Sequence, residues 1–189
     1  YGAFRNCTRL MHIDFPATLT QIIDRAFEGC SSLAEVYLPL NITFIGQDAF
    51  NTGVNTLFLC AAPELPERWN QNWAGLSQNI HWNIDYEQIG RFEKMLYLIE
   101  GNAVTILSVD QDVVELIIPE QIAGFPVTKI RSWAIKYCEN LRKLVIPDTT
   151  LTIEAGAIVA TRGIQSLTLP FLGGSRSDNE PLSYIFYGN

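Results

Sequence analysis

The chain has 189 residues, of which 48% are hydrophobic and 17% are charged. This length and composition allow a substantial core, which excludes intrinsic disorder and removes any need for disulfides or a metal in folding. There are 13 Lys and Arg against 20 Asp and Glu, giving a net charge of −7, and the basic residues are scattered singly. Nucleic acids and anionic membranes are therefore unfavourable partners.

No apolar run reaches the roughly 18 to 20 residues that a membrane-spanning helix needs. The first 20 residues include charged side chains and Pro16, which is not typical of a signal peptide. The chain begins at Tyr1 rather than Met. We therefore expect it to be part of a longer protein, whose targeting or anchoring sequences could lie elsewhere.

A pair formed by Ala and a large apolar residue recurs along the chain with a spacing of 23 residues. Three residues after the large member, three of the copies have a cysteine. Further on, four copies have two apolar residues separated by one position and followed by Pro. So many matched positions indicate a repeat protein. The pairs are Ala3-Phe4, Ala26-Phe27 and Ala49-Phe50 in a first group, and Ala134-Ile135 and Ala157-Ile158 in a second.

Each repeat predicts a short strand and a short helical segment. In Val36-Tyr37-Leu38 the two apolar side chains share one face of a strand, and Pro39 ends the strand because it cannot donate to a ladder. The Ala-Phe-x-x-Cys-x-x-Leu segment has an apolar spacing of three, which favours a turn or two of α- or 3₁₀-helix. One repeat cannot bury its apolar side alone. We therefore predict an α/β repeat solenoid of coils of about 23 residues with a parallel sheet on one side.

The repeat unit resembles the BspA-type leucine-rich repeat of bacterial and some protist surface proteins. The residues from Ala26 to Phe50 match its pattern most fully, and Ile45-Gly46 opens the following copy. The segment from Gly124 to Ile130 looks like the first coil of a second array, with the family's common short insertion between Pro and Ile. The resemblance implies a secreted or cell-surface location and a role in adhesion or protein–protein interaction.

The repeats divide the chain into three segments. Residues 1–59 form a first leucine-rich repeat array, and residues 60–90 form a C-terminal cap and connector without repeats. Residues 91–189 form a β-hairpin cap and a second array. Residues 95–99 and 104–109 alternate in hydrophobicity, which predicts a hairpin that covers the open first edge of the second array.

Few residues are suited to catalysis or to holding a cofactor. His12 is expected at an outward strand position and His81 in the cap, and neither has zinc-motif spacing, so both are interpreted as exposed or locally hydrogen-bonded. Asp110 and Asp112 resemble a fragment of a calcium loop but lack its glycine and distal Glu, which favours a polar turn. We expect no cofactor, no metal site and no enzymatic activity.

The cysteines have two interpretations. Cys7 and Cys30 occupy equivalent positions of adjacent coils, where the repeat needs a small apolar side chain, and Cys is often buried as a free thiol. We interpret all four cysteines as reduced structural thiols hidden inside the coils. A Cys7–Cys30 disulfide is the alternative.

Three tryptophans stand close together in the predicted cap, at Trp69, Trp73 and Trp82. A cap must cover the apolar end of the array, and large aromatic side chains do this well. The alternative is an aromatic platform that contacts sugar.

Side chains on the outward face of the strands are the candidates for binding. An exposed sheet rich in aromatic and β-branched residues is a plausible docking surface, although these residue types also simply favour strands. Further outward positions are Thr56, Glu115, Ser166 and Thr168. The candidate site residues are His12, Asp14, Glu35, Tyr37, Phe58, Ile117, Lys143 and Val145.

We therefore predict a non-catalytic extracellular binding or adhesion module that presents this sheet face to a protein or glycan of a host or neighbouring cell. Neither nucleic-acid binding nor membrane insertion is expected of this segment. One alternative is a spacer repeat in a larger surface protein. Another is an enzyme acting on polysaccharide, with Asp14 and Glu35 as its carboxylate pair.

Overall fold

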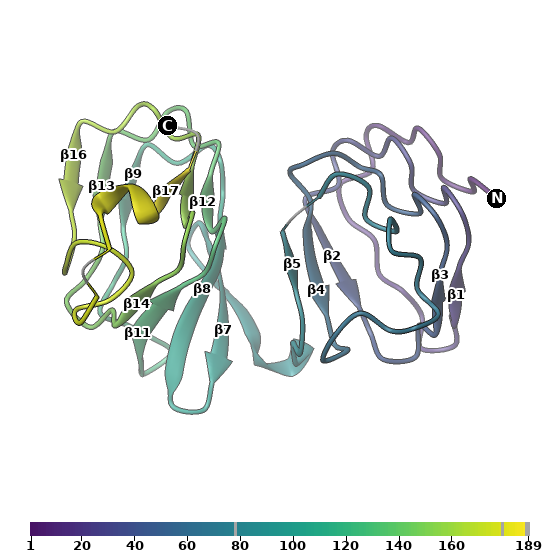
Figure 1. Cartoon of the computed structure of the whole chain (residues 1–189), viewed down its shortest axis with the longest axis horizontal. Helices are drawn as coiled ribbons and strands as arrows, with labels where there is room; N and C mark the ends of the chain where they lie inside the picture. Colours follow the sequence, from purple (N-terminus) through teal and green to yellow (C-terminus); the bar gives the residue numbers. More distant parts are fainter. Residues whose placement is uncertain (78, 179, 188–189) are drawn as a thin grey trace. The chain divides into compact units, whose positions relative to one another are not determined.

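The structure, a computed structural model, describes residues 1–77, 79–178 and 180–187. The chain divides into two compact units, Tyr1–Tyr86 and Glu87–Asn189 (Figure 1). Each unit is a β-solenoid whose successive coils pair through short parallel strands. The predicted solenoid with a parallel sheet is confirmed in both units.

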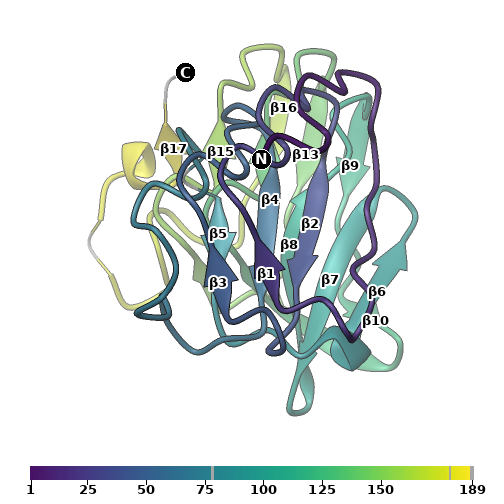
Figure 2. The ribbon, with the colours of Figure 1, turned by 90° about the vertical axis from the view of Figure 1, so that its right-hand side faces the viewer.

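The first unit contains two parallel sheets. In one, β1 and β3 align Ile22 with Ile45. In the other, β4 lies between β2 and β5 (Figure 2). The strands are β1 (Gln21–Ile22), β2 (Glu35–Leu38), β3 (Phe44–Ile45), β4 (Leu57–Cys60) and β5 (Ile80–His81).

The segment predicted as a cap without repeats continues the first solenoid by one coil. Trp69 forms an isolated parallel bridge with Ile45, and the Phe50 amide donates to the Trp73 carbonyl at 2.8 Å. Strand β5 then pairs with β4, aligning Ile80 with Phe58. Residues 60–86 therefore belong to the first unit. Trp69 aligns with Ile45, and the Trp73 carbonyl accepts the bond that the Ala49 carbonyl accepts in the preceding pair of coils.

The core of the first unit is organised around a column of aromatic rings. The Phe27 ring is nearly parallel to those of Phe4 and Phe50, with centroids 5.1 and 4.9 Å apart. Trp73 meets Phe50 edge-on at 6.0 Å and is 2% exposed. Stacked and edge-to-face aromatic pairs add to the stability gained by burial. Trp73 thus closes the column, as expected of a sealing residue.

The Ala-Phe-x-x-Cys segments form turns, and the predicted helical turns are wrong. Arg25 and Asp48, each two residues before a Phe, have φ of 57° and 51°, which a right-handed helix excludes. The Phe27 amide donates to the Ala49 carbonyl of the next coil at 2.7 Å. These backbone groups bond between coils rather than along a helix. The architecture is therefore a β-solenoid instead of the α/β solenoid that we predicted.

The structure assigns no α-helix to the residues that it describes. Its helical elements are two short 3₁₀ segments, η1 (Tyr86–Gln88) and η2 (Leu182–Tyr184), and both lie outside the repeated Ala-Phe and Ala-Ile segments.

Gly46, at the Ile-Gly step that opens a coil, lies against the preceding coil. Its amide donates to the Ile22 carbonyl at 2.8 Å. A Cβ at this position would lie 2.5 Å from the backbone nitrogen of Asp24, closer than real Cβ contacts allow. Only glycine permits this approach between the two coils.

The second unit has strands on three sides of its coils. One sheet has the order β16–β13–β9, a second has the order β12–β15–β17, and β11 pairs with β14 on the third side (Figure 1). The strands are β6 (Ile89–Phe92), β7 (Met95–Glu100), β8 (Ala103–Val109), β9 (Glu115–Ile117), β10 (Gln121–Ile122), β11 (Phe125–Ile130), β12 (Ile135–Lys136), β13 (Lys143–Val145), β14 (Thr152–Ile153), β15 (Ile158–Val159), β16 (Ser166–Thr168) and β17 (Phe186–Tyr187).

Strands β7 and β8 pair antiparallel around Gly101, within the span expected for a hairpin. Strand β6 adds a third antiparallel strand. Strand β8 also pairs in parallel with β11, aligning Ile106 with Ile130. These antiparallel strands thus continue the sheet that β11 and β14 form.

The repeated apolar residues of the second unit fill its core. Ile135 and Ile158, at the position of the Phe residues in the first unit, are 0% exposed, as are Leu141 and Leu144. Burying one such aliphatic side chain contributes about 1.5–3 kcal/mol to folding. The core also includes Leu116, Ile118, Ile122, Val127, Ile130, Cys138, Ile146, Ile153 and Ile185.

Candidate binding face

The outward face of the β9–β13–β16 sheet is the most regular candidate site. Strand pairing aligns Glu115, Lys143 and Ser166 in one row across the three strands, with Lys143 in the middle. A second row, two residues further along each strand, consists of Ile117, Val145 and Thr168. The face thus combines a polar row with a parallel β-branched row.

Alternation along the strands separates this face from the core. On β9, Leu116 is 3% exposed and Ile117 is 52% exposed. On β13, Leu144 is buried between the half-buried Lys143 and Val145. The outward side chains are therefore held by the backbone and remain available to solvent.

Charges on this face are weakly paired. The Lys143 ammonium lies 3.9 Å from the Glu115 carboxylate, and both side chains are largely exposed. An exposed pair at this distance contributes little to stability. Both groups are therefore free to exchange this contact for one with a partner.

The first unit places two predicted residues on one strand. Glu35 and Tyr37 alternate along β2 with Val36 and Leu38, which are 1% and 0% exposed. The Tyr37 ring contacts that of Tyr86, with centroids 4.7 Å apart. Tyr86 lies outside the repeat pattern, so no sequence signal indicated it.

The prediction that Phe58 points outward is wrong. Strand pairing aligns Phe58 with the inward Val36, and the Phe58 ring lies 4.8 Å from that of Trp73 in the core. Thr56, also predicted to be outward, is buried and donates to the Leu33 carbonyl at 2.7 Å. The third coil is shorter than the others, and a one-residue change of register reverses every side chain of a strand.

The prediction that His12 and Asp14 lie on a strand is also wrong. The structure assigns no strand to residues 11–16, although Ile13 and Phe15 pack against the core of the first unit. His12 Nε2 lies 3.0 Å from Asp14 Oδ2, and both side chains are mostly exposed. The two residues form a local polar pair beside the first coil.

Trp69, Trp73 and His81 are not placed as a sugar-binding site would require. Trp69 and Trp73 are 4% and 2% exposed, and the Trp69 indole donates to the Ile42 carbonyl at 3.1 Å. The rings therefore cannot present a platform to a ligand. His81 Nε2 lies 3.0 Å from the Asn79 side-chain oxygen, a local hydrogen bond of the kind expected.

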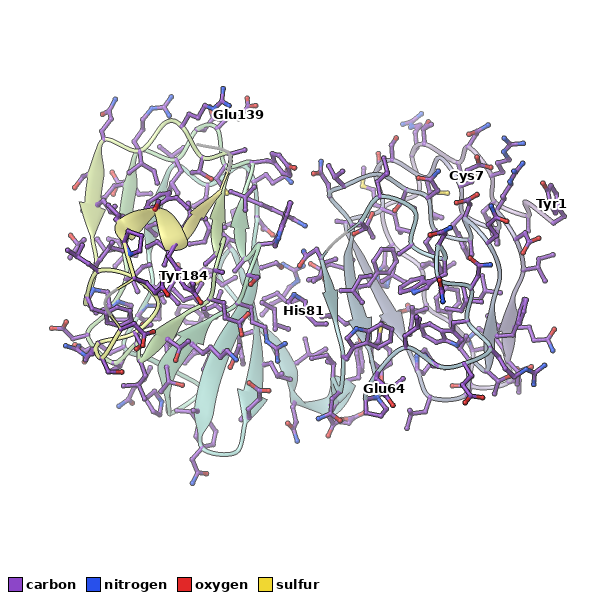
Figure 3. The ribbon with its side chains drawn as sticks, in the orientation of Figure 1. Tyr1, Cys7, Glu64, His81, Glu139 and Tyr184 are labelled. Carbon is purple, nitrogen blue, oxygen red and sulfur yellow. The ribbon has the colours of Figure 1, made fainter. Side chains whose placement is uncertain are left out.

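The cysteines are free thiols, but they are not equally hidden. Cys30, Cys60 and Cys138 are buried, whereas Cys7, labelled in Figure 3, is exposed, contrary to the prediction. Burial raises the pKa of the Cys138 thiol to about 11. Burial also raises the pKa of Cys60 well above its ordinary range. Both groups are thus unreactive thiols near neutral pH.

The predicted polar turn at Asp110 and Asp112 is held by cations. Lys94 lies 2.9 Å from Asp112 and 3.9 Å from Asp110, and Arg91 lies 3.4 Å from Asp110. Within the described residues, no group of three or more His, Cys, Asp or Glu side chains could hold a metal ion. The same residues include no helix with the length and apolarity required to cross a membrane.

Comparison with known proteins identifies the class. The family model described as "BspA type Leucine rich repeat region" matches residues 1–60 and 113–177 in six copies. The chain therefore belongs to the BspA-type leucine-rich repeat family. Repeats of this type are typical of surface proteins and indicate a non-enzymatic repeat module.

Solved structures include one similar chain, a leucine-rich cell surface protein from Faecalibacterium prausnitzii. It has 18% sequence identity and a TM-score of 0.48, and the match covers 88% of this chain and 49% of the other. The present chain thus spans about half the length of that protein. A search of curated proteins finds no match.

Proposed function

We propose that this chain is a non-catalytic binding module of a cell-surface protein and that it uses the outward face of the β9–β13–β16 sheet. The observation that supports this most directly is the alignment of Ile117, Val145 and Thr168 in one outward row across three paired strands, in which Ile117 and Thr168 are exposed and Val145 is half-buried. Exposed apolar side chains that no core contact requires are a feature of interaction sites. The partner is a protein or glycan outside the cell.

The polar row makes the two sides of this face chemically different. Glu115, Lys143 and Ser166 offer an acceptor, a cation and a hydroxyl in register beside the apolar row. Apolar contact with a polar rim is the usual arrangement of a protein interface. The face of β2, with Glu35 and Tyr37, provides a smaller acidic and aromatic site in the other unit.

The test uses the double variant Ile117→Ala and Val145→Ala in the complete chain. A glycan array and a panel of purified extracellular matrix proteins identify a ligand first, and the affinities of wild type and variant for that ligand are then measured. Loss of two apolar contacts at an interface should weaken binding by about tenfold or more. Circular dichroism and the melting temperature should remain near wild type, because both side chains point outward.

The matched control is Leu151→Ala, which removes an equally apolar side chain that is 57% exposed and lies outside the three strands. This control should bind like wild type. Equal binding by all three proteins would show that the ligand uses another surface. Equal loss in the control and the double variant would show that the effect is not specific to the sheet face.

A further inference from the structure

Cys7 and Cys30 occupy the same position in two coils that are directly bonded to each other. The Phe4 amide donates to the Ala26 carbonyl at 2.8 Å, just before Cys7. The Asn6 amide, its immediate neighbour, donates to the Glu28 carbonyl at 2.7 Å. The backbone just before Cys7 is therefore hydrogen-bonded to the backbone just before Cys30.

The Cys30 side chain reaches into the turn that contains Cys7. Its thiol donates to the Phe4 carbonyl at 3.1 Å, and the Cys7 amide donates to the same oxygen at 3.1 Å. Burial raises the pKa of Cys30, the Cys7 amide opposes that rise, and negative charge on Cys7 adds to it. The Cys30 thiol and the Cys7 amide thus share one acceptor, the Phe4 carbonyl.

The other cysteines have no such partner. The residue at this position of the third coil is Gly53, and the coil after Cys138 has Thr161 there. Cys60 lies inside β4, in the core of the first unit. Cys7 is exposed and therefore open to an oxidant, whereas the other three thiols are buried.

We propose that Cys7 and Cys30 form a disulfide when the protein meets a small-molecule disulfide, and that this bond ties the first coil to the second. The exposed Cys7 thiolate attacks one sulfur of the oxidant, forms a mixed disulfide and releases one small thiol. Cys30 then loses its proton and attacks the Cys7 sulfur, which releases the second small thiol. Two protein thiols are oxidised, and one small disulfide is reduced to two thiols, which retain the protons.

The bond would constrain a part of the first unit that forms no strand. Residues 11–16 have no strand assignment and lie between the two cysteines in sequence. The disulfide closes the loop between Cys7 and Cys30, which reduces the conformational entropy of the unfolded chain. The melting temperature of the first unit should rise by about 10 °C on oxidation.

The experiment treats the complete chain with oxidised glutathione and counts free thiols in the denatured protein. We expect the count to fall from the four of the sequence to two, with Cys7 and Cys30 joined in one pair of peptides on mass mapping. The second step should become faster as pH rises, because Cys30 must deprotonate. The variants Cys7→Ser and Cys30→Ser should both prevent the bond.

Cys30→Ser is expected to fold, because the Thr161 hydroxyl at the equivalent position donates to the Ile135 carbonyl at 3.5 Å. The matched control Cys138→Ser should still form the bond. A wild-type protein that stops at a Cys7–glutathione adduct, or that forms a dimer through Cys7, would overturn the proposal. Peptide mapping of wild type decides between these outcomes even if a variant fails to fold.

Discussion

At one position of the repeat, a small side chain donates a hydrogen bond to the previous coil. The Cys30 thiol donates to the Phe4 carbonyl at 3.1 Å, and the Thr161 hydroxyl donates to the Ile135 carbonyl at 3.5 Å, in equivalent geometry. Both side chains are small and donate a hydrogen bond, whereas Gly53 has no side-chain donor at the same position of the third coil. Thr161 can therefore take the place of Cys at this position of the repeat.

Glu154 bonds coils of the second unit through charge. Its carboxylate lies 2.7 Å from the Lys129 ammonium and accepts the Ser132 amide at 3.0 Å. Burial alone would raise the pKa of Glu154, but the bonds from Lys129 and Ser132 outweigh burial and hold the pKa below its usual value. The ionised form is therefore favoured by folding.

We predict that Glu154→Gln destabilises the second unit at neutral pH by about 0.5–1 kcal/mol, a modest value because the group is only half-buried. A folded-state pKa below the unfolded value, which is about 4.3, gives stability that is present above that pH and is lost as pH falls through the folded pKa. Urea unfolding of wild type and Glu154→Gln at pH 7 and pH 3 measures the difference in stability. A stability difference that is equal at both pH values would contradict the assignment.

Strands of two to four residues persist here because each is paired with the next coil. β1 and β14 have two residues each, too few to be stable alone, and the ladders through β3 and β11 hold them in place. Their side-chain direction follows from the register of the pairing. The direction in which each side chain points is therefore set by the pairing between coils.

The element-scale prediction compares Phe58→Ala with Tyr37→Ala. Phe58 is 0% exposed and meets the rings of Phe50 and Trp73 at 5.5 and 4.8 Å, so its truncation should cost about 3–5 kcal/mol. Tyr37 lies on the outward side of β2, and its loss should cost about 1 kcal/mol or less. Thermal melts of both variants provide the measurement. A larger loss for Tyr37→Ala would mean that the two faces are exchanged.

At the scale of the whole chain, each unit has its own core. The cluster around Phe27 and Phe50 contains residues of the first unit, and the cluster around Ile135 and Leu144 contains residues of the second. No buried residue belongs to both clusters within the part of the chain that the structure describes. A substitution in one cluster therefore acts first on the packing of its own unit.

We predict that Phe27→Ala lowers the stability of the first unit by about 3–5 kcal/mol, because the ring is 3% exposed and stacked between two others. Amide hydrogen exchange should become faster in residues 1–86 and stay unchanged in residues 87–189. The exposed Phe4→Ala serves as the milder control, since this ring is 43% exposed. Faster exchange in both units would show that the two cores unfold together.

The repeat spacing alone was sufficient to predict the solenoid, its parallel sheet and the family. It also predicted which residues of β2 and β13 point inward, as at Val36, Leu38 and Leu144. These features follow from local periodicity, because alternation along a strand and equal coil length are both visible in one dimension. The binding role of the outward residues remains a prediction.

The tertiary structure alone decided three features. The Ala-Phe segments form turns because their amides bond to the next coil, a choice that apolar spacing cannot reveal. The coil with Trp69 and Trp73 escaped detection because its residue types differ from the repeat while its backbone still pairs through Ile45. Phe58 points inward because the pairing of β4 with β2 aligns it with the inward Val36. No local pattern in the sequence sets this register. Contacts between residues far apart in sequence determine all three.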